Sequence, residues 1–260
     1  MATLTQGWHI QARVIKALMI RELYTRFGRD NIGFLWMMVE PLLFPALVAV
    51  MWRFMKGSDE HGISVIAYVV SGYVPLTLFR HGVNRSAGVF SANASLMYHR
   101  QIKLLDFIFV RFLIEMIGSM MSFVLIAIIL LYFDLMPVPA NPGYLLAGWL
   151  LYCAFSFSLC LVLAPLSEVS EVLEKFLPVT TYIVIPFSGT FNQTSWLAPG
   201  IQDIMIWSPF VDAMEMIRYG IFGHDVDPIY NIWVPIIGSL VFTVVGLALC
   251  RSVRRKMVVE

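Results

Sequence analysis

The chain alternates between long apolar runs and short polar connections. Six runs stand out, and most approach the roughly 20 residues that a helix needs to cross the hydrocarbon core of a bilayer. Proline interrupts the second run at Pro75 and the short fifth run at Pro178 and Pro186. The pattern predicts an all-α, polytopic membrane protein that forms a single transmembrane domain over residues 1–260. We expect its six transmembrane helices at about residues 34–55, 63–82, 108–133, 144–166, 176–191 and 231–250.

The composition agrees with a membrane protein. Of the 260 residues, 59% are hydrophobic and 13% are charged, whereas about 25% are charged in an ordinary soluble domain. The mean hydropathy is +0.77. Cys153, Cys160 and Cys250 lie inside apolar runs without the spacing of metal ligands, so we interpret them as small packing residues. No small-residue cleavage site precedes the first apolar run, and we expect no cleaved signal.

Residues 1–33 form a basic segment before the first apolar run. Apolar and charged residues alternate there, but charges fall on more than one side of the predicted helix. We expect an interfacial helix on the cytoplasmic membrane surface, and a solvated basic leader is the alternative. The cations of this segment are Arg13, Lys16, Arg21, Arg26 and Arg29.

The distribution of Lys and Arg predicts the orientation of the chain. Fourteen of them fall in residues 1–33, in the second connection together with Arg80 at the end of the preceding span, in the fourth connection and in the tail at 251–260. Only Arg53, Lys56 and Arg218 fall in connections on the other side. Because cytoplasmic loops carry the excess of basic residues, we expect both termini in the cytoplasm.

The start of the first apolar run combines a glycine, a tryptophan, an acid and a proline. Gly33 and Trp36 are followed by Glu40 and Pro41 inside the run. A carboxylate near the bilayer centre costs roughly 2.5–3.5 kcal/mol on insertion scales, so we expect Glu40 to face protein or a water-filled cavity.

Three motifs carry a resemblance to a known family. Arg26-Phe27-Gly28, Gly33, Leu35-Trp36 and Glu40-Pro41 resemble the start of the first transmembrane helix in type-2 ABC exporter permeases. The branch that exports capsular polysaccharide is the most similar. Asn93-Ala94-Ser95-Leu96 with His99-Arg100 resembles the coupling-helix region of the same family. Ser208-Pro209-Phe210, Glu215, Arg218-Tyr219-Gly220 and Phe222 resemble its final external motif. Together the motifs extend over nearly the whole chain in the family's order.

The resemblance implies partners and a cargo. It implies a homodimer in the bacterial inner membrane, bound to a separate ABC subunit that holds ATP and Mg, so we expect no cofactor in this chain. The implied cargo is a lipid-linked capsular polysaccharide, and the implied further partners are a periplasmic adaptor and an outer-membrane polysaccharide exporter. No feature suggests nucleic acid. Similar architectures that export O-antigen, teichoic acid or a hydrophobic drug are the alternatives.

Residue roles follow from the same resemblance. It implies ATPase coupling for Ser91, Asn93, Leu96 and His99, and structural motif positions at Gly33, Pro41, Pro209, Glu215 and Arg218. For the substrate, the paired donors of arginine suit phosphate and carboxylate groups, and aromatic faces suit sugar rings. Topology signals and interfacial aromatic belts are the alternatives for these residues. The candidate substrate-binding residues are Arg26, Arg29, Trp36, Glu40, Tyr68, Tyr73, Arg85 and Arg100.

Two connections have unusual composition. Residues 189–231 are too hydrophobic for a solvated loop and too broken by proline for a membrane span, so we expect short re-entrant external helices. Within them, Glu215 and Arg218 have the spacing of a pair on one helix face. Residues 167–175 are acidic, and they either contact a basic partner surface or keep the loop solvated.

The sequence offers no convincing catalytic or metal site. It contains no HExxH, CxxC or GxSxG motif, and no GxxxxGK[ST] motif for a nucleotide. Arg111 and Glu115 have i,i+4 spacing, and we expect a structural ion pair within one helix. An intramembrane enzyme on lipid carriers and a secondary transporter are therefore less well supported than an export permease.

Overall fold

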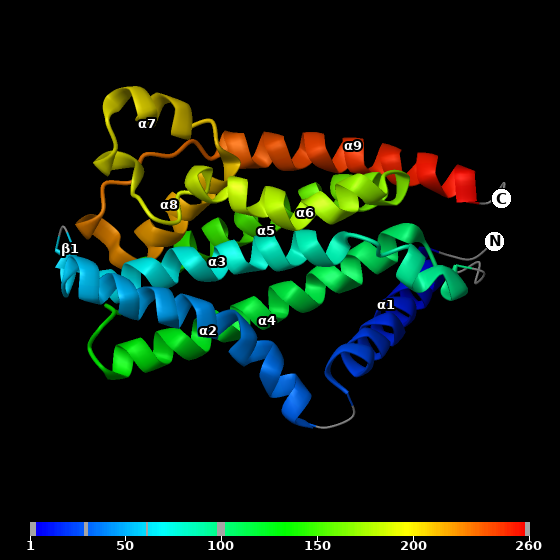
Figure 1. Cartoon of the computed structure of the whole chain (residues 1–260), viewed down its shortest axis with the longest axis horizontal. Coiled ribbons are helices and arrows are strands. Elements are labelled where there is room, and N and C mark those ends of the chain that lie inside the picture. Colours follow the sequence, from blue (N-terminus) through cyan, green and yellow to red (C-terminus); the bar gives the residue numbers. More distant parts are fainter. Residues whose placement is uncertain (1–3, 29–30, 61, 98–101, 258–260) are drawn as a thin grey trace.

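The computed structural model describes residues 4–28, 31–60, 62–97 and 102–257, and this part of the chain is almost entirely helical (Figure 1). Arg29, His99 and Arg100, which the sequence proposed as site residues, lie outside the described residues. The long helices are α1 (Leu4–Phe27), α2 (Asn31–Lys56), α3 (Val65–Ser86), α4 (Leu104–Tyr132), α5 (Pro142–Val169) and α9 (Trp233–Met257). The shorter ones are α6 (Glu171–Ile183), α7 (Pro199–Met205) and α8 (Pro209–Phe222).

Small elements connect these helices. Strands β1 (Asp59–Glu60) and β2 (Ile63–Ser64) pair antiparallel between α2 and α3. The 3₁₀ helix η1 (Ser91–Leu96) lies between α3 and α4. Three further 3₁₀ helices are η2 (Ile185–Phe187), η3 (Thr194–Trp196) and η4 (Gly223–Asp225).

The structure confirms a polytopic helical membrane protein. Four helices of the described chain are long and apolar enough to cross a bilayer, namely α4, α5, residues Met38–Lys56 of α2 and Trp233–Arg254 of α9. The count of six spans stays a prediction, because α3 and α6 do not meet the same standard. α3 has 22 residues but carries Arg80, His81 and Arg85 in its second half. α6 has 13 residues, or about 20 Å of helix, against about 30 Å of hydrocarbon.

α3 is the central helix of the fold. It contacts α2, α4, α5, α6 and α8, and in Figure 1 it runs through the middle of the bundle. All residues from Val65 to Phe79 are buried except the partly exposed Ile66. Polar residues in the second half of α3 are therefore surrounded by other helices, which makes that half the place to look for a functional site.

The two ends of the bundle differ. α1, η1 and the last turns of α9 lie at one end, which we call the α1 end (Figure 1). β1, α7 and α8 lie at the opposite end, which we call the α7 end. Residues 185–231 at that end form short helices, none long enough to span a bilayer, and we call them the cap. Short helices were predicted there, and their re-entry into the membrane stays a prediction.

Close helix contacts fix the cap on the bundle. α5 packs against both α8 and α9. A Cβ atom added to Gly148 would lie 2.8 Å from Ala213 O, and one added to Gly220 would lie 2.6 Å from Leu145 Cα. Because both neighbours are backbone atoms, glycine is what permits the close approach of α5 and α8.

Candidate functional site

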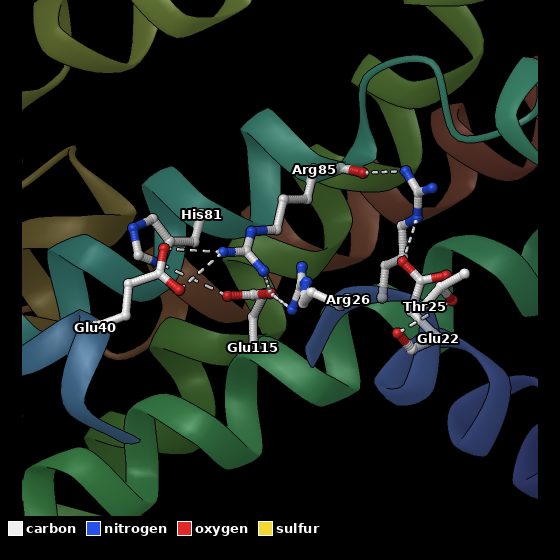
Figure 2. Close-up of polar contacts among 8 residues, drawn as sticks. Glu22, Thr25, Arg26, Glu40, His81, Arg85 and Glu115 are labelled. Carbon is white, nitrogen blue, oxygen red and sulfur yellow. Dashed lines mark hydrogen bonds and ion pairs between the residues drawn. The ribbon is translucent and has the colours of Figure 1, made fainter. Parts of the chain in front are cut away.

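A cluster of five ionisable side chains joins four helices near the α1 end. Arg26 comes from α1, Glu40 from α2, His81 and Arg85 from α3, and Glu115 from α4 (Figure 2). We call these five residues the charge cluster. Only one of the five, Glu115, is enclosed almost completely, with a side chain that is 6% exposed.

Arg85 lies between the two carboxylates of the charge cluster. Its Nη2 atom is 3.1 Å from Glu40 Oε1, and its Nη1 atom is 2.9 Å from Glu115 Oε1 (Figure 2). Arg26 Nη1 reaches the same Glu115 oxygen at 2.5 Å, and His81 Nδ1 lies 3.6 Å from Glu115 Oε2. Glu115 therefore joins its own helix, α4, to both α1 and α3, whereas Glu40 is tied to the cluster through Arg85.

The position of Glu40 follows from the sequence around it. Pro41 comes directly after it and lies inside α2, where proline removes a backbone donor and disturbs the helix. The Ser122 hydroxyl of α4 lies 2.6 Å from the Met38 carbonyl oxygen, which fixes this turn of α2 against α4. The prediction that Glu40 faces protein is confirmed by its contact with Arg85.

Arg111 forms a second ion pair beside the charge cluster. Its Nε atom is 3.1 Å from Glu22 Oε1 of α1, and its Nη1 atom donates to Arg85 O at 2.8 Å. The predicted pair between Arg111 and Glu115 within α4 is therefore wrong. Partners on α1 and α3 are available to both side chains, and each binds across the helix interface instead.

The segment Ser91–Leu96, which we call the coupling segment, is attached to α1. Asn93 is buried, and its side chain donates to Val89 O at 2.8 Å and accepts from Arg21 Nη1 at 2.8 Å. Ser91 is exposed and Leu96 is partly exposed at the α1 end. The sequence singled out Asn93 but missed Arg21 as its partner, because 72 residues separate the two in the chain.

The acidic link at 167–175 lies against the start of the coupling segment. Gly88 has a φ of +59°, and its amide donates to Ser167 Oγ at 3.4 Å. A Cβ atom added to Gly88 would lie 2.5 Å from Glu174 Oε1. The link therefore lies beside the residues that directly precede the coupling segment.

The candidate aromatic residues fall into two groups. Tyr68 and Tyr73 are buried, and their rings pack against Trp196 and Phe191 of the cap at 4.9 Å and 5.8 Å between centroids. Trp36 is exposed on α2. Tyr182, which is exposed on α6, stacks with Arg80 at 4.0 Å from the guanidinium carbon to the ring centroid.

Glu215 and Arg218 fix the cap, but they do not form the predicted ion pair. Glu215 accepts hydrogen bonds from Thr194 N and Thr194 Oγ1, both at 2.8 Å, and from the side chain of Gln193. Arg218 donates to Gly189 O at 2.6 Å. Backbone groups of residues 189–194 thus compete successfully for both side chains. Burial raises the pKa of Glu215, while the hydrogen bonds from Thr194 act in the opposite direction.

The remaining motif residues have local roles. Pro209 begins α8, where a proline lacks only a donor that would have no partner in the helix. Gly33 lies in the first turns of α2. Among the residues that the structure describes, no group of three or more His, Cys, Asp or Glu side chains is arranged to hold a metal ion.

The fold and the charge cluster define a class of protein: a polytopic helical membrane protein whose helices are joined by ion pairs near one end of the bundle. Residues 13–222 match the family described as ABC-2 type transporter, and the chain belongs to this family. It is the membrane subunit of an inner-membrane transporter whose ATPase is a separate subunit.

Curated relatives extend over nearly the whole chain. The capsule polysaccharide export inner-membrane protein BexB of Haemophilus influenzae is 35% identical over 250 residues, 96% of this chain and 94% of BexB. The corresponding protein CtrC of Neisseria meningitidis serogroup B is 37% identical over 240 residues, 92% of this chain and 91% of CtrC. The polysialic acid transport protein KpsM of Escherichia coli is 24% identical over 250 residues, 95% of each chain.

Proposed function

We propose that this chain exports a lipid-linked capsular polysaccharide from the cytoplasm across the bacterial inner membrane. The similarity to BexB and CtrC, which are named as capsule polysaccharide export proteins, supports a capsular polysaccharide as the cargo. Export is driven by ATP hydrolysis in the separate ABC subunit, which holds the nucleotide and Mg. The chain works as a homodimer and hands its cargo to a periplasmic adaptor and an outer-membrane exporter.

One structural observation carries the proposal: α1 connects the coupling segment to the charge cluster. Arg21 binds Asn93 of the coupling segment, and Arg26 binds Glu115 of the charge cluster five residues further along the same helix. Between them, Glu22 holds Arg111. A helix is stiff over so short a distance, so a displacement of the coupling segment by the ATPase moves Arg26 with it.

The charge cluster then acts as an ionic lock between helices. When α1 moves, Arg26 leaves Glu115, and the bond of Arg85 to Glu115 strengthens at the expense of its bond to Glu40. Release of Glu40 removes one polar tie between α2 and α3, so that α2 can shift against α3 and open the bundle laterally. The arginines that lose their carboxylate partners meet the phosphate and any acidic sugars of a lipid-linked glycan.

The topology within this proposal is the six-span arrangement. Both termini lie in the cytoplasm, since the basic residues that flank the spans are concentrated at the α1 end. α3 is the second span and α6 with η2 is the fifth, residues 1–33 form the interfacial segment, and 251–260 form the tail of one transmembrane domain. The exposed apolar faces of α2 and α6 contact lipid or the second copy.

The function is tested by deleting the gene that encodes this chain in a capsulated host. Lipid-linked capsular polysaccharide is expected to accumulate in the cytoplasm, and expression of the chain restores capsule at the surface. Accumulation of O-antigen or teichoic acid, or sensitivity to a hydrophobic drug with normal capsule, would contradict the proposed cargo.

The coupling mechanism is tested by Leu96→Asp, which places a charge on the surface proposed to contact the ATPase. The variant is expected to insert and to bind its ATPase weakly, with export reduced by about tenfold or more, because a like or unpaired charge at an interface centre costs 2–5 kcal/mol. Leu96→Met is the matched control and keeps export. Normal export by Leu96→Asp would show that the partner binds elsewhere.

A further inference from the structure

One arginine of the central helix α3 remains outside the ion pairs of the described residues. Arg80 lies on α3, five residues before Arg85, and is partly buried. Within the described ranges, none of the ion pairs includes Arg80, and its Nε atom is buried without a hydrogen-bond partner. By contrast, Arg85 contacts two carboxylates and Arg111 contacts Glu22.

The contact that Arg80 does make is with an aromatic ring. Its guanidinium carbon lies 4.0 Å from the centroid of Tyr182 on α6, which is the geometry of a cation–π interaction. Tyr182 is itself 56% exposed. The guanidinium is therefore held in place between α3 and α6 while its hydrogen-bond donors remain without acceptors among the described residues.

An arginine in this position is costly unless a partner compensates its charge. Ionisable side chains among membrane helices almost always pair with one another, bind backbone carbonyls or face a water-filled path. The chain supplies two carboxylates for Arg85 on the opposite flank of α3, but the structure gives none to Arg80. Beyond the Tyr182 ring, water in a path between the helices and a partner from outside the chain are the remaining ways to compensate it, and the planar fork of arginine suits a carboxylate or a phosphodiester as that partner.

We infer that Arg80 and Tyr182 form a subsite for an anionic group of the exported glycan. This inference rests on the proposed export function and adds to it a binding site between α3 and α6 for the carboxylates or phosphodiesters of the cargo. Arg80 binds the anion through its free donors, and the Tyr182 ring orients the guanidinium and offers an apolar edge to the adjoining sugar.

The experiment uses the chain in complex with its ATPase in nanodiscs of neutral phosphatidylcholine. The probes are sialic acid oligomers, which carry carboxylates, glycerol phosphate oligomers, which carry phosphodiesters, and neutral dextran. Equilibrium binding and the stimulation of ATPase activity are measured for the wild type, Arg80→Gln, Arg80→Lys and Tyr182→Leu. Arg13→Gln is the matched control, because Arg13 is an exposed cation of α1 far from the bundle interior.

The expected result is that Arg80→Gln weakens binding of at least one acidic oligomer by about tenfold and leaves the response to dextran unchanged. Arg80→Lys keeps the charge but loses the planar fork, so its affinity for the acidic oligomer is expected to lie between those of the wild type and Arg80→Gln. Tyr182→Leu is expected to weaken binding by a smaller factor than Arg80→Gln does. Arg13→Gln behaves as the wild type. If Arg80→Gln fails to assemble, Arg80→Lys and Tyr182→Leu decide the question alone.

Other outcomes separate this inference from the proposed function. A wild-type response to acidic oligomers that Arg80→Gln and Arg80→Lys retain in full would overturn the subsite and leave export standing. A wild type that hydrolyses ATP but binds no glycan would overturn both. Two further results with Arg80→Gln would each assign Arg80 a different partner and overturn the subsite: loss of phosphatidylglycerol binding, measured in parallel nanodiscs that contain this lipid, with unchanged glycan binding, or dissociation of the chain's own oligomer.

Discussion

The charge cluster and the cap satisfy their charged residues in different ways. In the charge cluster, Arg85 binds side-chain carboxylates from two other helices and remains partly exposed. In the cap, Arg218 is fully buried and donates to backbone carbonyls, while Glu215 accepts from the backbone amide of Thr194. A side-chain pair between helices can exchange partners when one helix shifts, whereas a backbone partner leaves only if the loop itself unfolds.

The packing around glycines also differs between the two regions: it is tighter at the cap than near the charge cluster. A Cβ atom added to Gly72, where α3 meets the cap, would lie 2.6 Å from the backbone oxygen of Thr190. A Cβ atom added to Gly82, nearer the charge cluster, would lie 3.1 Å from the side chain of Phe112, which can move. The comparison identifies the cap as a fixed frame and the charge cluster as a joint. The predictions below test this assignment.

The largest effect is expected from Gly220→Ala in the cap. The added methyl group meets the backbone of Leu145, so α5 and α8 must separate. Overpacking of this kind costs about 1–3 kcal/mol or more, which exceeds the ~1 kcal/mol that alanine gains over glycine in a helix. We expect a clearly lower Tm in detergent and little folded protein at 37 °C. Gly143→Ala is the control, because nothing lies within 4 Å of its added Cβ atom; equal Tm values for the two variants would show that the cap is not rigid.

Glu115→Gln is expected to affect the joint more than the frame. The substitution keeps the shape of the side chain but removes the charge that Arg26 and Arg85 share. Breaking a fully buried pair costs about 3–5 kcal/mol, and because these arginines are partly exposed we expect about 1–2 kcal/mol. Export is expected to fall by about tenfold, within the range in which mutations modulate coupling between sites.

The readouts for Glu115→Gln are Tm, basal ATPase activity and capsule export. Asp203→Asn, a neutralisation at an exposed position of α7, is the control and is expected to change none of them. A fall in Tm with unchanged export would make Glu115 a structural residue only.

The sequence allowed the helical membrane fold and the contact of Glu40 with protein to be predicted. Hydrophobic length indicates spans directly, and an acid inside an apolar run almost always faces protein or a water-filled cavity. The side-chain partners of the charged residues were not predictable in the same way. Local spacing suggested the pairs Arg111–Glu115 and Glu215–Arg218, and both are wrong, because residues brought in by tertiary packing offered better partners.

Arg80 and Arg21 illustrate the same limit. Both counted only as basic residues near a membrane end in the sequence, since nothing in their neighbours distinguishes them from topology signals. Their roles depend on Tyr182 and Asn93, which are 102 and 72 residues away along the chain. Only the packing of α3 against α6, and of α1 against η1, makes these pairs visible.

A smaller effect is expected from Glu40→Gln. Glu40 has a side chain that is 37% exposed and is tied to the charge cluster through Arg85. Its loss is expected to cost about 0–1 kcal/mol of stability, so the protein inserts and folds normally. Export is expected to fall severalfold, because the lock between α2 and α3 no longer closes. Wild-type export by Glu40→Gln would show that Glu40 only makes local contacts in the helix turn beside Pro41.

The smallest effect is expected for the contact between Arg21 and Asn93, and a double-mutant cycle measures it. Arg21→Ala and Asn93→Ala each remove one partner of a 2.8 Å hydrogen bond to a charged group. The coupling free energy is expected to be about 0.5–1.5 kcal/mol, with export reduced about twofold to threefold by either single change. If the contact transmits motion, the double variant exports no worse than the weaker single variant, because the connection is already broken. Independent losses that multiply in the double variant would mean that α1 does not carry the signal from the coupling segment to the charge cluster, and the joint would have to be driven through α3 and α4 instead.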